Sequence, residues 1–150
     1  MKRIFSAVLA ALLIFALAAC GDSAAKVVDV QQLADALKAG ITDETLTAVS
    51  SDELAFSLSA MPETYTAAAY RGTAAAEVIA VQCQSGDDAA LVKASLESHL
   101  AELKDQASKY QPEQVPLLDS AILSAKGNCV VLCITGDTGA ANATIKEYLG

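Results

Sequence analysis

Six consecutive apolar residues limit most strongly what this 150-residue chain can fold into: Cys129, Val130, Val131, Leu132, Cys133 and Ile134. An apolar run of this length, with no polar position on either face, is typical of a central strand buried on both sides. The preceding Gly127-Asn128 pair is typical of a tight turn. Residues 120–135 therefore predict a hairpin whose return strand lies inside a sheet.

An earlier segment predicts a second hairpin. The stretches "TAAAYRG" and "AAEVIAVQCQ" flank Gly72-Thr73, which we interpret as a tight turn between two antiparallel strands. Side chains alternate between the faces of a strand, so two sets are expected on the second strand. We expect the face with Ile79, Val81 and Cys83 to be buried and the face with Val78, Ala80, Gln82 and Gln84 to be the other one.

Three segments have helical periodicity. The clearest runs from about Asp88 to Tyr110, where apolar residues recur at steps of three and four. Asp29 is expected to cap a helix ending near Ala39, and Asp137 to start the last helix. Residues 41–64 give the weakest pattern, in which Ser51 or Asp52 is expected to cap a short helical turn that ends near Leu58.

The order of elements after residue 64 is therefore strand, strand, helix, strand, strand, helix. This order predicts an α+β fold with a mainly antiparallel four-stranded sheet, preceded by an N-terminal helix and covered by helices on at least one face. Residues 29–150 are expected to form a single domain of this kind, a size that suits one hydrophobic core.

The beginning of the chain predicts export and lipid attachment. Lys2 and Arg3 precede an apolar run that ends in "LAAC", and residues 1–19 have the organisation of a signal peptide. The run is shorter than the roughly 20 residues of a membrane-spanning helix. The "LAAC" segment resembles a bacterial lipobox, which implies cleavage between Ala19 and Cys20 and a lipid on the Cys20 thiol. Residues 20–28 would then form a short tether; the alternative is an ordinary signal peptide with a chance cysteine.

The charge of the chain argues against some partners. The formal net charge is −8, and removal of the leader makes it more negative because the leader contains Lys2 and Arg3 but no acid. An acidic surface is repelled by nucleic-acid phosphates and by anionic lipid headgroups. We therefore expect no nucleic-acid partner, and contact with the membrane through acyl chains on Cys20. The acids could also bind calcium, but a soluble negative surface explains them.

The remaining cysteines do not form a recognisable metal or redox motif. Cys83, Cys129 and Cys133 contain no Cys-x-x-Cys spacing. Cys129 and Cys133 would lie about 13 Å apart along one strand, too far for a disulfide. Cys83 could bridge to one of them across the sheet, or all three could be small buried apolar residues.

No catalytic constellation is visible in the sequence, and no cofactor or metal site is predicted. His99 is the only histidine; Glu102 follows it by one turn, and we expect a half-exposed structural histidine. The acidic pairs that begin at Asp43, Asp52 and Asp87 stand where helices are expected to start, which explains them as capping residues. Tyr65, Tyr70, Tyr110 and Tyr148 could line a groove, although Tyr110 and Tyr148 fall on the inner stripes of helices and are expected in the core.

Three segments together resemble a family of bacterial lipoproteins, domain of unknown function 4358. They are "AAEVIAVQCQSGDDAALVKASLESHLAELKDQ", "YQPEQVPLLDSAILSAKGNCVVLCIT" and "ATIKEYL", and the resemblance extends over about residues 29–149. The family implies a Gram-positive-type cell envelope and supplies no catalytic residues. Cys129 and Cys133 depart from the apolar or aromatic residues usual there, which favours a packing role for them.

These observations predict a lipid-anchored protein on the extracytoplasmic face of the cell membrane. The first hypothesis is a non-enzymatic interaction module that binds a cell-envelope protein. The second is a small-ligand or ion-binding lipoprotein accessory to a transporter. The third is an enzyme that uses Cys83 or His99, which would require a solvent-accessible thiol with a basic neighbour.

Overall fold

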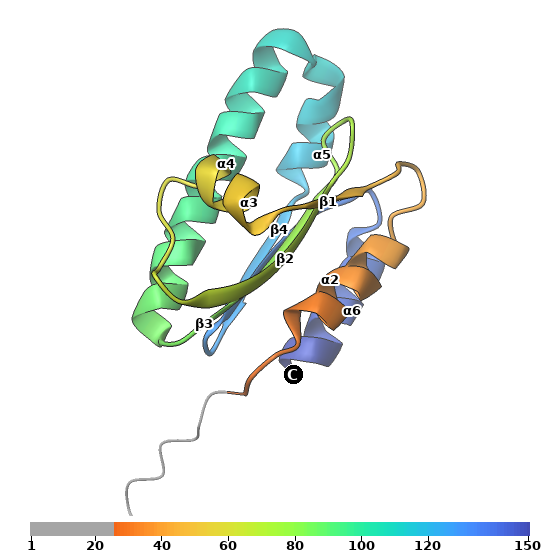
Figure 1. Ribbon diagram of the computed structural model, residues 1–150. Helices are drawn as coiled ribbons and strands as arrows, with labels where there is room; N and C mark the ends of the chain where they lie inside the picture. The colour runs from red at the N-terminus through yellow and green to blue at the C-terminus, as the bar shows by residue number, and fades with distance from the viewer. Residues whose placement is uncertain (1–25) are drawn as a thin grey trace, which may run out of the picture.

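The computed structural model describes residues 26–150 (Figure 1). The predicted leader, the cleavage site at Ala19 and Cys20, and most of the tether lie outside the described residues. Within residues 26–150, no helix is both long enough and apolar enough to cross a membrane.

A five-stranded antiparallel sheet forms the centre of the domain, with strand order β1-β2-β3-β5-β4. Its strands are β1 (Thr47–Val49), β2 (Tyr65–Arg71), β3 (Glu77–Cys83), β4 (Ile122–Lys126) and β5 (Cys129–Ile134). The α+β class and the two hairpins are confirmed, but the prediction of four strands was one short. Strand β1 has only three residues and no buried position, so it carries no alternating pattern in the sequence.

Strands β3 and β5 pair with each other at the middle of the sheet, and every residue of both is buried. The prediction for β5 is confirmed. For β3, the expectation of a single buried face was wrong, because Val78 and Ala80 are as buried as Ile79 and Val81. The reason is that helices cover both faces of the sheet along β3 as well as along β5.

The two helical layers contact opposite faces of the sheet (Figure 1). Helices α2 (Val30–Ala39) and α6 (Thr138–Leu149) lie together on one face. The long helix α4 (Gly86–Tyr110) covers the other face, together with α3 (Ser51–Ser57) and α5 (Val115–Asp119), which a short 3-10 turn, η2 (Pro112–Gln114), connects to α4. Each layer has its own apolar core against the sheet.

Local capping explains where the helices begin. The Asp29 carboxylate accepts a hydrogen bond from the Gln32 amide, and Asp137 accepts one from Ala140, so both predicted caps are confirmed. Ser50 caps α3, so the expected cap at Ser51 or Asp52 was one or two residues too late. Ser85 caps α4, which begins at Gly86, two residues before the expected start at Asp88.

The connection between β2 and β3 is longer than the predicted Gly72-Thr73 turn. It consists of residues 72–76 and is closed by a 2.9 Å hydrogen bond from the Gly72 amide to the Ala76 carbonyl. The Glu44 carboxylate holds this loop by accepting hydrogen bonds from the backbone amides of Ala74, at 2.8 Å, and Ala76, at 3.3 Å. Glu44 therefore clamps a loop and does not cap a helix.

Candidate functional site

A buried carboxylate, Glu77, lies at the start of β3 on the sheet face that α4 covers. Glu77 is only 2% exposed, which is unusual for an acidic residue. Burying an ionised carboxylate is unfavourable unless charged or hydrogen-bonding partners compensate for the lost water. Strand pairing supplies the first partner, because Glu77 stands directly opposite Arg71 of β2.

Both oxygens of Glu77 have a partner at short distance. Arg71 Nε donates to Oε1 at 2.7 Å, and His99 Nε2 lies 2.7 Å from Oε2. Burial raises the pKa of the Glu77 carboxyl, but the hydrogen bonds and charges of His99 and Arg71 outweigh burial and hold the pKa below its ordinary value. Glu77 is therefore a buried anion stabilised from two directions.

Arg71 extends this network to the surface. Its Nη1 lies 3.2 Å from Glu53 Oε1 on α3, and its side chain is one-third exposed. The third guanidinium nitrogen, Nη2, is buried and has no hydrogen-bond partner within residues 26–150. The guanidinium of Arg71 thus connects α3 to β2 and β3. Its Nη2 atom is a donor that no group within residues 26–150 accepts from.

His99 connects the network to α4, and its position differs from the prediction. It is 8% exposed, not half-exposed, and its partner is Glu77 in β3, not Glu102 one turn along the same helix. An ionised carboxylate can only accept, so the Nε2 atom of His99 carries the hydrogen. In the neutral ring Nδ1 is then a free acceptor, and this atom has no hydrogen-bond partner in the described part of the chain.

The His99 ring lies at a surface cavity of about 190 Å³ between α3 and α4. The other lining residues are Phe56, Ser57, Leu58, Ser59, Ser98 and Glu102. The α3–β2 connection is fixed against α4 by Ser95, whose hydroxyl accepts from the Ala60 amide at 3.0 Å and lies 3.1 Å from Ser59 Oγ. We call this hollow, with its lining residues, the His99 cavity.

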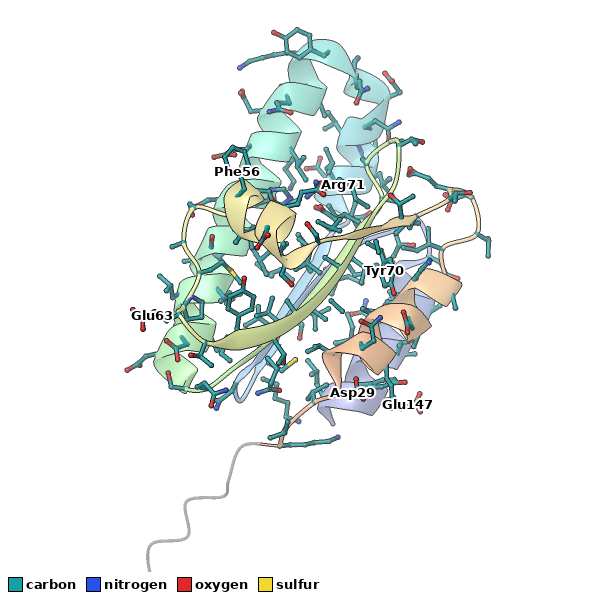
Figure 2. All side chains as sticks on the ribbon, in the orientation of Figure 1. Asp29, Phe56, Glu63, Tyr70, Arg71 and Glu147 are labelled. Carbon is teal, nitrogen blue, oxygen red and sulfur yellow. The ribbon has the colours of Figure 1, made fainter. Side chains whose placement is uncertain are left out.

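Phe56 forms the outer rim of the His99 cavity and is 93% exposed, the highest value among the exposed large apolar side chains of the described chain. In Figure 2 it projects from α3 away from the sheet. Helix α3 buries only Leu54 against the domain, so packing of the fold itself does not use Phe56.

Chemically, the site offers an anchored imidazole and no activated nucleophile. The Ser57 and Ser98 hydroxyls donate to backbone carbonyls of their own helices, those of Leu54 and Ala94, and are not bonded to His99. The arrangement suits hydrogen bonding to a group that enters the cavity. Within residues 26–150, no group of three or more His, Cys, Asp or Glu side chains is placed to bind a metal ion.

The three cysteines are buried, free thiols, as one of the two sequence interpretations required. Cys83 packs in the core on the α4 side, and Cys129 and Cys133 pack on the α2 side, so no disulfide joins them. Burial raises the pKa of the Cys129 thiol to about 11 and that of Cys133 to about 12. The hypothesis of thiol chemistry loses its support, because a reactive cysteine needs an accessible thiolate.

The tyrosines do not meet in one groove. Tyr65 packs on the α4 side of β2, whereas Tyr70 packs on the α2 side, where Lys38 Nζ lies 4.3 Å from its ring centre. Figure 2 shows Tyr70 between the sheet and α2. Tyr148 is partly buried, as expected, but Tyr110 is 81% exposed at the end of α4. The prediction for Tyr110 was wrong because α4 extends beyond the sheet that would cover it.

The family model for domain of unknown function DUF4358 matches residues 59–135, which contain β2, β3, α4, β4 and β5. The chain belongs to this family. The three network residues Arg71, Glu77 and His99 lie inside the DUF4358 segment, whereas Glu53 and Phe56 precede it. No curated protein and no solved structure matches the chain.

Sequence reasoning missed Glu77 and Arg71. The only signal for Glu77 was an acid inside the otherwise apolar "AAEVIAV" stretch, and for Arg71 a base at the end of the preceding strand. An acid at the first position of a buried strand is a sign of a paired charge.

Proposed function

We propose that this DUF4358 protein is a lipid-anchored module on the extracytoplasmic face of the cell membrane, where it binds another protein of a Gram-positive-type envelope. In this proposal the chain is cleaved between Ala19 and Cys20, and Cys20 carries the lipid. The lipobox and the charged, apolar leader support the anchor. Two or more acyl chains are needed for stable attachment, since one chain binds a bilayer only marginally.

The anchor would hold the domain close to the bilayer. The chain between Cys20 and Lys26 can span at most about 20 Å when fully extended. The core begins two residues later, where the Val28 amide donates to Gln82 Oε1 of β3 at 3.0 Å. A partner of this domain would therefore be another protein at the membrane surface.

The anchor is tested by mass spectrometry of the protein purified from its own membrane. We expect a new amino terminus at Cys20 with a mass increase that corresponds to a diacylglyceryl group. The Cys20→Ser variant should leave the membrane fraction. Recovery of an uncleaved, unmodified chain would contradict the lipid anchor. It would leave the proposed binding surface around Phe56 to be tested separately.

The observation that carries the binding function is Phe56, 93% exposed at the rim of the His99 cavity. Aromatic side chains are enriched at protein interfaces, because a rigid ring buries much apolar area at little entropic cost. The surrounding serines, Glu102 and the His99 ring supply hydrogen-bonding groups at the same place. An apolar anchor next to a small polar hollow is the composition of a binding hot spot.

Photo-crosslinking in intact cells tests this surface. Benzoylphenylalanine is placed at position 56 and, as a matched control, at position 110, because Tyr110 is also an exposed aromatic residue but lies at the end of α4. We expect a discrete crosslinked protein from position 56 only. Equal crosslinking patterns from both positions, or none from position 56, would argue against the Phe56 surface.

A second candidate, a small-ligand lipoprotein accessory to a transporter, is favoured by His99, which lines the cavity and whose Nδ1 has no hydrogen-bond partner within residues 26–150. Native mass spectrometry of the purified protein distinguishes the two functions. A small molecule that co-purifies with the wild type and is lost in His99→Gln would favour ligand binding. A wild-type spectrum free of such a ligand favours the protein partner.

A further inference from the structure

A second surface, on the opposite side of the sheet from the His99 cavity, lies between the edge strand β4 and helix α6. It is a groove of about 400 Å³, lined chiefly by Ser124, Ala125, Lys126, Ile145, Lys146 and Leu149. Ile145 and Leu149 belong to the core on the α2–α6 side, so the groove has an apolar floor. No acidic side chain lines it.

The backbone of β4 is open on the side away from β5, because β4 is the last strand in the sheet order. Lys126 pairs with Cys129 across the two-residue turn, where Gly127 has the positive φ of 56° that such turns require. In a two-residue hairpin the flanking residues form a hydrogen-bonded pair, and the pattern then alternates along the strand. The backbone N–H and C=O groups of Leu123 and Ala125 therefore point outward.

An independent contact fixes the same alternation. The Cys83 amide of β3 donates to the Asn128 carbonyl at 2.8 Å, so the Asn128 backbone points toward β3. The next residue, Cys129, must then point toward β4 and its partner Lys126. The edge of β4 is thus a short template with open backbone groups at two residues.

The groove gathers the two basic side chains that have no partner within residues 26–150. Four of the other basic side chains are in ion pairs, Lys38 lies over Tyr70 and Lys26 donates to the Tyr148 carbonyl. Lys126 and Lys146 have no such contact, and both line the groove. In a chain with 18 acids and 10 bases, this is a local reversal of the overall charge.

We infer that this groove binds an extended acidic peptide segment of a partner protein, added to β4 as a further strand of the sheet. The open backbone groups of Leu123 and Ala125 would hold the peptide main chain. Lys126 shares its face of β4 with Ile122, which packs toward the α2–α6 core, so it lies on the same side as Lys146. Because side chains alternate along a strand, the peptide should have acidic residues at alternate positions, facing the two lysines.

The test is selection from a random linear peptide library displayed on phage, with the full chain immobilised in a mild detergent. We expect enriched peptides that have two acidic residues at positions i and i+2 and no proline between them. The Lys126→Glu/Lys146→Glu double variant should bind these peptides at least about tenfold more weakly, because two attractive charge pairs become repulsive. Ala125→Pro should also weaken binding. The fold tolerates proline at this edge position, but proline lacks the outward N–H group that would bond to an added strand.

The control is Lys93→Glu, an exposed lysine on α4 away from the groove, which should leave peptide affinity unchanged. If Ala125→Pro unfolds the protein, as judged by circular dichroism, the Lys126→Glu/Lys146→Glu variant alone tests the inference. Both lysine side chains are exposed, so their replacement should not unfold the protein. Failure to enrich peptides, enrichment without acidic residues, or binding that ignores both lysines would overturn the inference. Lysine-dependent binding of soluble short-chain phosphatidylglycerol in place of peptides would overturn it as well, and would assign the groove to lipid headgroups.

Discussion

Replacement of Glu77 by glutamine should destabilise the protein substantially at neutral pH. The carboxylate makes two hydrogen bonds of 2.7 Å to positively charged or chargeable groups, in a position that is 2% exposed. Hydrogen bonds to charged groups contribute about 1.5–3 kcal/mol each. Glutamine can still accept from Arg71 with its oxygen, but its NH₂ group then faces His99, whose neutral ring must change tautomer to accept at Nε2, so both contacts lose the carboxylate charge that strengthens them.

We therefore expect Glu77→Gln to lower the free energy of unfolding by about 2–4 kcal/mol. The estimate lies below the full cost of breaking a buried ion pair, because Arg71 is one-third exposed and still has Glu53 as a partner. The matched control is Glu53→Gln. Its side chain is 58% exposed, and removal of an exposed ion pair should cost less than about 1 kcal/mol.

The same variant has a pH signature with a definite sign. The pKa of Glu77 is lowered in the folded state, so its stabilising contribution is fully present above the ordinary value of 4.5 and is lost as the pH falls through the folded-state pKa. The gap between wild type and Glu77→Gln should thus be constant at neutral pH and shrink below pH 4.5.

Urea unfolding followed by far-ultraviolet circular dichroism measures this gap at several pH values. The slope of the unfolding free energy against urea should be the same for wild type and both variants, which keeps the comparison valid. A Glu77→Gln protein within about 0.5 kcal/mol of wild type at neutral pH would refute the stabilising role of the network. A gap that stays constant as the pH falls well below the ordinary carboxyl range would refute its assignment to the ionised carboxylate.

Three other predictions concern the packing of α4, the burial of the thiols and the clamped loop. Leu96→Ala should cost about 2–5 kcal/mol because Leu96 is fully buried on the inner face of α4, whereas Leu91→Ala on the exposed side of that helix should cost less than about 1 kcal/mol; equal urea midpoints would contradict the packing. In a Cys20→Ser protein, the three buried thiols should resist Ellman's reagent until urea unfolds the domain, because burial raises the pKa of Cys133 to about 12; rapid labelling of the native protein would disprove their burial. Glu44→Ala should speed amide hydrogen exchange in residues 72–76 several-fold while leaving the central strands protected, and unchanged exchange would show that the carboxylate does not clamp the loop.

The sequence alone determined the features that depend on local chemistry. The buried strand β5, the strand β3, the helix α4 and the caps Asp29 and Asp137 are all indicated by neighbours along the chain, and each element lies where it was predicted. The lipobox prediction at Cys20 is also a local motif and stays a prediction. Periodicity and capping act over one to three turns, so a single sequence is sufficient to specify them.

Only the tertiary structure decided which distant residues meet. Glu77 and His99 are 22 positions apart and meet because α4 crosses the face of β3; the intrahelical partner Glu102, suggested by spacing, is not the one used. Likewise, β1 is a strand only because it pairs with the edge of β2. Tyr110 is exposed because the end of α4 extends beyond the sheet. Strand order and helix placement depend on contacts between segments far apart in the chain, and the periodicity of one segment says nothing about which other segment will cover it.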